Sequence, residues 1–181
     1  MLLNTPVCDF GWQAPNFTLL DTNNRLHGLD TLIGANGLLI AFICNHCPYV
    51  KAIIDRLVSD AIALKQCGIN TVAIMPNDYH SYPEDSPENM LAFINRHHIP
   101  FPYLIDETQQ VAKDYAAVCT PDFFGLNAEG KLHYRGRLDD ARMGTGDNRQ
   151  PELLEAMTKV AESGQGPEHQ IPSMGCSIKW K

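Results

Sequence analysis

A continuous apolar run at residues 38–43 is the clearest pattern along the chain and predicts a strand buried on both faces, and residues 70–75, apolar from Val72 onward, predict a second buried strand. Between them, apolar side chains recur at the i, i+3, i+4 and i+7 spacing of an amphipathic helix. These positions are Val50, Ile53, Ile54, Leu57, Val58, Ala61 and Ile62. Lys51, Asp55, Arg56, Ser59 and Asp60 occupy the opposite, polar face, and Gly68 is the expected stop.

The rest of the chain predicts shorter elements around this strand–helix–strand unit. Residues 16–20 and the turn residues that follow indicate a short hairpin. The later elements are helices over 87–97, 107–117 and 153–161, a strand over 100–105, and a hairpin of 122–126 with 131–135. Alternating strands and helices predict one α/β domain over residues 1–181, with a largely parallel sheet and an antiparallel edge. A Gly/Pro-rich tail over 163–181 ends it.

Composition narrows the function classes. The 181 residues are 44% hydrophobic and 19% charged, which suits a globular domain with one core. A net charge of -7 and the lack of clustered Lys and Arg argue against nucleic acid as a partner. No apolar run approaches the roughly 20 residues of a membrane span, and no secretion signal is recognisable. We therefore expect a cytoplasmic protein without a membrane partner.

Six cysteines, at positions 8, 44, 47, 67, 119 and 176, are too few for a disulfide-stapled scaffold of this length. In a reducing compartment a C-x-x-C is more often catalytic or metal-binding than structural. Cys44 and Cys47 form such a pair, directly after the buried run and before Pro48 and the long helix. A helix N-terminus stabilises a thiolate and lowers its pKa. The pattern therefore predicts reversible dithiol–disulfide chemistry.

With the C-x-x-C at a helix start and Thr120-Pro121 before the final hairpin, the chain resembles the thioredoxin-like superfamily. An extra α–β unit, about residues 87–105, and the front segment 14–19 resemble its redoxin branch, which includes the peroxiredoxin-like alkyl hydroperoxide reductase/thiol-specific antioxidant proteins. The resemblance implies a three-layer α/β/α fold around a mixed central sheet, with an N-terminal hairpin and this α–β insertion. It also implies that Pro121 is cis and lies against the two cysteines.

The resemblance implies roles for the pair. Cys44 is expected to be the exposed nucleophile that attacks a disulfide, and Cys47 to resolve the mixed disulfide. His46 is expected to stabilise the thiolate as an imidazolium, although a solvent-facing spacer is the simpler interpretation. Pro48, Thr120 and Pro121 are expected to support the site. The expected partners are a protein or small-molecule disulfide substrate and a thioredoxin- or glutathione-type electron donor, and no cofactor is expected.

A thiol peroxidase with an antioxidant role is the second prediction. Peroxiredoxins carry Thr or Ser three residues before the reactive cysteine, and here those positions hold Ala41 and Cys44. The missing hydroxyl weakens the peroxidase interpretation. The third alternative is a metal-binding module in which Cys44, His46, Cys47 and Cys119 hold zinc or an iron–sulfur cluster. No second Cys/His pair at metal-ligand spacing supports it.

Two other cysteines are candidates for a third redox thiol. Cys119 lies two residues before Pro121, where the simpler interpretation is a small buried hydrophobic residue. Cys176 lies in the tail, where we expect mobility, and is either a resolving thiol or an idle one. The charged loop 135–142 is expected to be solvated, with an anion-holding rim of the active site as the alternative.

Overall fold

The computed structural model describes all residues from Met1 to Lys181. The strands are β1 (Leu2–Asn4), β2 (Thr18–Asp21), β3 (Leu26–Gly28), β4 (Gly37–Phe42), β5 (Ile69–Met75), β6 (Tyr103–Ile105), β7 (Cys119–Thr120), β8 (Asp122–Asn127), β9 (Leu132–Tyr134) and β10 (Met174–Ser177). Seven of them form one sheet in the order β3-β2-β6-β5-β4-β8-β9. The remaining three form a small sheet in the order β1-β10-β7.

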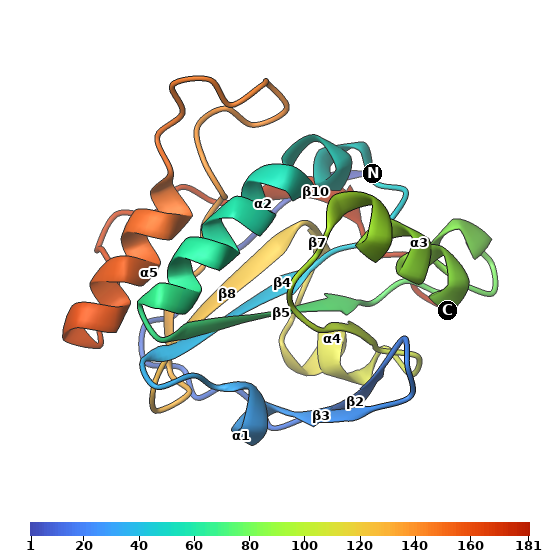
Figure 1. The fold of residues 1–181 in the computed structure, drawn as a ribbon, viewed down its shortest axis with the longest axis horizontal. Coiled ribbons are helices and arrows are strands. Elements are labelled where there is room, and N and C mark those ends of the chain that lie inside the picture. The colour runs from blue at the N-terminus through green and yellow to red at the C-terminus, as the bar shows by residue number, and fades with distance from the viewer.

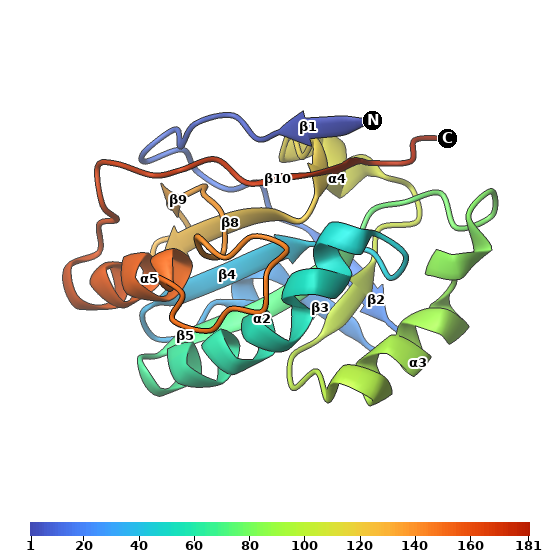
Figure 2. The ribbon, with the colours of Figure 1, turned by 90° about the horizontal axis from the view of Figure 1, so that it is seen from above.

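Helices cover both faces of the main sheet (Figures 1 and 2). They are α1 (Leu29–Leu32), α2 (Pro48–Gln66), α3 (Pro87–His97), α4 (Gln110–Asp114) and α5 (Glu152–Ser163), with a single 3₁₀ turn at Pro83–Asp85. One core lies between the sheet and α2, α3 and α5, and the other lies against α1 and α4. None of the helices has the length and apolar character required to span a bilayer. The predicted three-layer α/β/α arrangement is confirmed.

Strand β4 shows why the apolar run predicts its place so well. It pairs in parallel with β5 and antiparallel with β8, so it lies at the centre of the mixed sheet. Successive side chains of a strand point to opposite faces. Leu39 and Ala41 accordingly enter the α2–α3–α5 core, and Leu38 and Ile40 enter the α1–α4 core. Both faces of β4 are buried, which is why no polar residue interrupts the run.

The expected helix over 107–117 is much shorter in the structure. Helix α4 covers only Gln110–Asp114, and the carboxylate of Asp106 accepts hydrogen bonds from the N–H groups of Val111 and Ala112 at its start. Ala116 has a positive φ of 50° and is exposed, although it was expected on the buried face. The left-handed turn there ends the helix and directs the chain into β7.

Two residues of α2 lie opposite to expectation. Ile62 is 54% exposed, and Asp60 is buried at 1% exposure. Asp60 is buried because the guanidinium of Arg149, in the loop before α5, pairs with its carboxylate. Arg149 also bonds to Asp139, which is in turn paired with Arg56 of α2. A continuous ion-pair network therefore fastens the loop to the helix.

The charged loop is less solvated than expected. Arg135 and Asp139 are 7% and 2% exposed, so the prediction of a solvated loop is wrong for these two residues. Arg135 pairs with the fully buried Asp122 at 3.0 Å and packs over the ring of Phe124. Each buried charge has a partner of opposite sign, as burial of ions requires.

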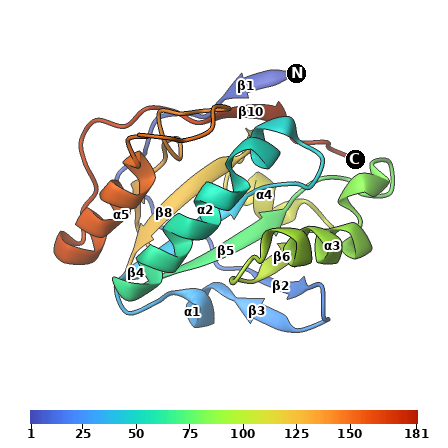
Figure 3. The ribbon, with the colours of Figure 1, turned by 45° about the horizontal axis from the view of Figure 1, so that its top comes forward.

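The C-terminal segment is also more ordered than expected. Residues 174–177 form β10, which pairs with β1 on one side and with β7 on the other. Figures 2 and 3 show β10 beside β1 and close to the start of α2. The prediction of a mobile tail at Cys176 is therefore wrong, because both backbone edges of β10 are hydrogen-bonded to other strands. The local sequence contains no strong strand signal, and the pairing depends on partners more than 50 residues away.

Candidate active site

The two cysteines of the C-x-x-C lie where the centre of the sheet passes into the long helix. Strand β4 ends at Phe42, and Cys47 is the N-cap residue of α2, with Pro48 at the first helical position. Proline suits that position because its missing N–H would have no partner there. Cys44 and Cys47 are 1% and 0% exposed, so both thiols are buried beneath the surface.

Thr120 contacts both sulfurs. Its hydroxyl Oγ1 lies 3.4 Å from Sγ of Cys44, and its carbonyl oxygen accepts a hydrogen bond from the thiol of Cys47 at 3.2 Å. The Thr120–Pro121 peptide bond is cis, as the resemblance implied. The structure therefore brings together the two cysteines and the Thr-Pro segment, about 75 residues apart in the chain. It also places a hydroxyl at Cys44 that no residue of the local loop supplies.

The surroundings of the two thiols move their pKa values in opposite directions. The pKa of Cys47 is lowered to about 4, first by the hydrogen bond from the Cys44 thiol and then by the N–H of Val50, with burial opposing. The pKa of Cys44 is raised by that same hydrogen bond, by burial and by the charge of Asp85. Cys47 is therefore the more acidic thiol of the pair, and while it is protonated it donates its hydrogen bond to the carbonyl of Thr120.

Asp85 holds the C-x-x-C loop in place, and its carboxylate is fully buried. It accepts hydrogen bonds from the backbone N–H of Asn45 at 2.8 Å, from the backbone N–H and Nδ1 of His46 at 3.3 and 2.7 Å, and from Nδ2 of Asn77 at 2.8 Å. Sequence reasoning gave Asp85 no role in the thiol site, because the two segments are 40 residues apart. No spacing in the chain reveals the contact.

Tyr103 is a second residue that the sequence did not identify. Its buried hydroxyl lies 3.1 Å from Oδ1 of Asn45 and 3.3 Å from the carbonyl of Ile43. Burial raises the pKa of Tyr103 well above its ordinary value, so this hydroxyl remains a donor. The loop between the cysteines is thus fixed from two sides, by Asp85 and by Tyr103.

The predicted metal set is not assembled as expected. Ligand atoms of Cys44, His46 and Asp85 lie within 4.8 Å of one another. Cys119 instead bonds through Sγ to the carbonyl of Pro121 at 3.6 Å. The carboxylate of Asp85 is already saturated by four donors, so a metal would have to displace existing hydrogen bonds. The donor set therefore fits a hydrogen-bonded loop better than a metal centre.

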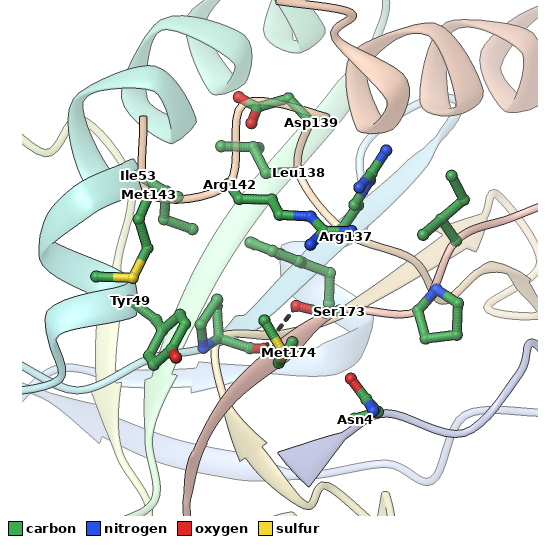
Figure 4. Close-up of a pocket in the computed structure, with 14 residues that line it drawn as sticks. Asn4, Tyr49, Ile53, Arg137, Leu138, Asp139, Arg142, Met143, Ser173 and Met174 are labelled. Atoms are coloured by element: carbon green, nitrogen blue, oxygen red, sulfur yellow. Dashed lines mark hydrogen bonds between the residues drawn. The ribbon is translucent and has the colours of Figure 1, made fainter. Parts of the chain in front are cut away.

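A pocket of about 320 Å³ opens beside Pro121 (Figure 4). Tyr49 and Ile53 of α2, Met174 of β10, and Arg137 and Arg142 of the charged loop are among its lining residues. None of the six cysteines lines it, although Tyr49 and Pro121 adjoin the thiol site in the chain.

The arginines of the charged loop differ in their partners. Arg137 is paired with Glu152 through two short hydrogen bonds, and Arg135 with Asp122. Arg142 is exposed, has no ion-pair partner, and lies near Arg137 at the pocket in Figure 4. Of these arginines, Arg142 is therefore free to bind an anion at the pocket, which was the alternative for the charged loop. Arg135 is already paired with the buried Asp122.

Comparisons with known proteins agree with this geometry. The sequence model of the AhpC/TSA family matches residues 10–135. An uncharacterized conserved protein from Geobacillus kaustophilus has 42% identity and a TM-score of 0.93, covering 100% of this chain and 97% of its own. A hypothetical protein from Sinorhizobium meliloti has 37% identity and a TM-score of 0.91, with 98% and 97% covered.

More distant structures share the fold. A putative protein disulfide isomerase from Bacteroides thetaiotaomicron has 16% identity and a TM-score of 0.68, with 87% of this chain and 94% of that chain covered. Peroxidoxin BcpB from Mycobacterium tuberculosis has 13% identity and a TM-score of 0.65, with 85% and 96% covered. Both confirm the thioredoxin-like fold. No match was found among curated proteins.

Proposed function

Since the chain belongs to the AhpC/TSA family, we propose that it is a thiol–disulfide oxidoreductase whose redox centre is the Cys44–Cys47 pair. The observation that carries the proposal is the contact of both buried sulfurs with Thr120 at the start of α2, where Sγ of Cys44 lies 3.4 Å from the Thr120 hydroxyl and Sγ of Cys47 lies 3.2 Å from its carbonyl oxygen. A thiolate is the nucleophile in disulfide exchange, and the second thiol can then close the intramolecular disulfide.

We infer roles that differ from those of the resemblance. The resemblance gave the attack to Cys44, whereas the lowered pKa of Cys47, which the neighbouring Cys44 causes first, favours Cys47 as the attacking thiolate. In this proposal, the Cys47 thiolate forms the mixed disulfide with one sulfur of the substrate and releases the other sulfur as the first product thiolate. Cys44 then attacks Cys47, passes its proton to the second leaving sulfur, and completes the Cys44–Cys47 disulfide.

Three other side chains support the pair. Asp85 accepts the backbone N–H groups of Asn45 and His46, and the hydroxyl of Tyr103 lies against the side-chain oxygen of Asn45 and the carbonyl of Ile43. His46 points Nδ1 at Asp85, so its influence on the thiols is coupled to that carboxylate. A positively charged imidazole in this pair would be largely balanced by the carboxylate. We therefore assign His46 to positioning of the loop in preference to direct stabilisation of the thiolate.

The pocket beside Pro121 suggests the kind of substrate. Its walls combine apolar side chains such as Ile53 and Met174 with the unpaired cation of Arg142. This lining suits a disulfide that carries both apolar groups and a carboxylate, such as a peptide disulfide. A thioredoxin- or glutathione-type electron donor and a cytoplasmic location remain predictions from the sequence.

A thiol peroxidase is the second candidate, and one observation favours it. The hydroxyl of Thr120 stands 3.4 Å from Cys44, which partly replaces the hydroxyl missing from the local motif. However, no guanidinium lies against either sulfur, since Arg135 is paired with Asp122. Consumption of hydrogen peroxide or an alkyl hydroperoxide, coupled to thioredoxin or glutathione, distinguishes this activity from disulfide exchange.

Reduction of insulin disulfides tests the main proposal. Cys44→Ser and Cys47→Ser are each expected to lose most or all turnover, because the Cys44–Cys47 disulfide cannot form in either variant. Cys67→Ser, at the other end of α2, is the matched control and is expected to retain full activity. Full activity in either of the first two variants would contradict the assignment.

A further inference from the structure

Cys176 packs against the core cluster that contains Cys44 and Cys47, although it is 129 positions beyond Cys47 in the chain. Strand β10 places it opposite Thr120 of β7 and opposite Leu2 of β1. Thr120 is the residue whose hydroxyl and carbonyl contact Cys44 and Cys47. The small sheet therefore places the sulfur-bearing residue Cys176 beside Thr120, which already contacts the sulfurs of Cys44 and Cys47.

Cys47 is influenced by both of the other thiols. Its sulfur contacts the carbonyl oxygen of Thr120, the residue opposite Cys176 in the small sheet, and the neighbouring Cys44 and Cys176 both lower its pKa. Disulfide exchange requires the attacking and leaving sulfurs to approach one central sulfur. The order Cys44, Cys47, Cys176 has this form, with Cys47 as the central atom.

Gly175 allows β10 to come this close. A Cβ at Gly175 would lie only 2.0 Å from the carbonyl oxygen of Thr120 and 2.9 Å from the nitrogen of Pro121, both of them backbone atoms. Only glycine permits that approach without displacing the strand. The close approach of β10 to Thr120 therefore depends on Gly175, the residue immediately before Cys176.

Exposure separates the three thiols. Cys44 and Cys47 are 1% and 0% exposed, whereas Cys176 is partly exposed. Met174, two residues earlier on the same face of β10, lines the pocket of about 320 Å³. A disulfide bound in this pocket would therefore reach Cys176 with less movement of the protein than either member of the buried pair requires.

We propose that Cys176 is the surface thiol of a three-thiol relay, through which an external disulfide exchanges with the buried Cys44–Cys47 pair. This inference rests on the proposed function of that pair and adds the route by which electrons pass from the pair to the substrate. It also explains how an external disulfide can react with Cys44 and Cys47, although both thiols are buried.

The relay balances as three exchanges. In the first, Cys176 attacks RSSR′, its proton passes to the Cys47 thiolate and on to R′S⁻, and R′SH leaves with Cys176 joined to RS. In the second, the Cys47 thiolate attacks the Cys176 sulfur, forming Cys47–Cys176 and releasing RS⁻. In the third, Cys44 attacks Cys47, giving Cys44–Cys47, and its proton ends on Cys176. The substrate is reduced by two electrons, and the buried pair is oxidised by two.

Trapping the second species tests the relay. Reduced Cys44→Ser and Cys44→Ala proteins are treated with oxidised glutathione, blocked with N-ethylmaleimide and digested with trypsin without reduction. Cleavage after Lys and Arg puts Cys47 in a peptide of residues 26–51 and Cys176 in one of residues 160–179. These two peptides are expected to be joined by a disulfide. In wild type, the final disulfide is expected inside the 26–51 peptide.

The outcomes separate the relay from the proposed function. A Cys44–Cys47 disulfide in wild type, without any Cys47–Cys176 link in the two Cys44 variants, overturns the relay and leaves the pair intact. No disulfide within residues 26–51 in wild type overturns the function of the pair itself. The link is expected to persist when Cys119→Ser is added, because Cys119 bonds to Pro121 and makes no hydrogen bond to Cys47.

A rate measurement tests whether Cys176 is the entry point. Formation of the Cys44–Cys47 disulfide by oxidised glutathione is followed in Cys176→Ser, with Cys119→Ser as control. Loss of the surface thiol is expected to slow the reaction at least about tenfold, since the buried pair must then react directly. The Cys119 control is expected to match wild type. Equal rates in Cys176→Ser and wild type would overturn the entry role.

Discussion

Nδ1 of His46 lies 2.7 Å from Oδ2 of Asp85, a carboxylate with no exposed surface. The same carboxylate accepts the backbone N–H groups of Asn45 and His46, so one side chain from the loop before α3 fixes the segment between the two cysteines. The thiol pair therefore depends on an acid that is distant in sequence and whose carboxylate makes no hydrogen bond to either sulfur.

Asp85→Asn is expected to destabilise the protein by about 2–3 kcal/mol, because the amide introduces a donor that faces the donors of His46 or Asn77 in a buried site. Removal of the negative charge is also expected to lower the pKa of Cys44, which Asp85 raises. Denaturant unfolding and thiol titration measure the two effects. Glu84→Gln, an exposed neighbour, is the control and is expected to stay within about 0.5 kcal/mol of wild type.

The pH dependence of stability follows from Cys47. Its pKa falls from an ordinary 9.0 to about 4 in the folded state. A depressed pKa contributes stability that is complete above the unfolded value and is lost as the pH falls through the folded one. The reduced protein is therefore expected to gain stability over Cys47→Ser as the pH rises from about 4 to about 9. Urea unfolding across this range measures it, and parallel curves for the two proteins would contradict it.

Gly175→Ala tests the close approach of β10 to Thr120. The added methyl group overlaps backbone, so we expect a loss of about 1–3 kcal/mol in unfolding free energy and a weaker Cys47–Cys176 contact. Amide exchange of β10 and β7 measures whether the strand has moved. Ser177→Ala, whose side chain makes no hydrogen bond, is the matched control in the same strand and is expected to behave as wild type.

Arg142→Glu tests the charge of the pocket. Oxidised glutathione carries carboxylates, whereas cystamine carries only ammonium groups. The variant is expected to raise KM for glutathione disulfide several-fold and to leave or lower KM for cystamine, because charge complementarity acts on binding and encounter. Arg96→Glu, on the exposed side of α3, makes the same charge change away from the pocket. Equal effects of the two variants on KM would show that the pocket does not bind the carboxylates of glutathione disulfide.

The ion-pair network between α2 and the loop before α5 is expected to be structural. Arg149→Ala leaves Asp60 buried without its cation and is expected to cost about 3–5 kcal/mol. The double variant Asp60→Leu with Arg149→Leu is expected to recover a substantial part of that loss, since no unpaired charge at position 60 remains. Thermal unfolding of the single and double variants measures the difference.

The elements with strong periodic patterns were predicted well from the sequence. Strand β4, helix α2 and strand β5 have long apolar repeats, and their burial follows from alternation or helical spacing. Strand β10 was missed because Met174-Gly175-Cys176-Ser177 has no apolar alternation and is ordered by pairing with β1 and β7. Asp60 was assigned to the polar face because its partner Arg149 is 89 residues away.

The site was predicted in the same uneven way. Cys44, Cys47 and the Thr120-Pro121 segment were found from motif and position, and the structure brings them together. Asp85, Tyr103 and the contact between Cys176 and Cys47 depend on tertiary pairing, which leaves no local signature. Which thiol is the more acidic depends on the tertiary neighbours that shift each pKa, such as Asp85 for Cys44 and Cys176 for Cys47, and the C-x-x-C spacing alone does not specify them.

Mapping of the disulfide in wild-type protein tests the central claim most directly. The protein is equilibrated in glutathione buffers of graded potential, alkylated and digested, and the peptide of residues 26–51, which holds both Cys44 and Cys47, is weighed. We predict a single two-electron transition in which this peptide passes from two alkylated cysteines to an internal disulfide. A peptide that remains doubly alkylated even in the most oxidising buffer, while the protein stays folded, would contradict the account.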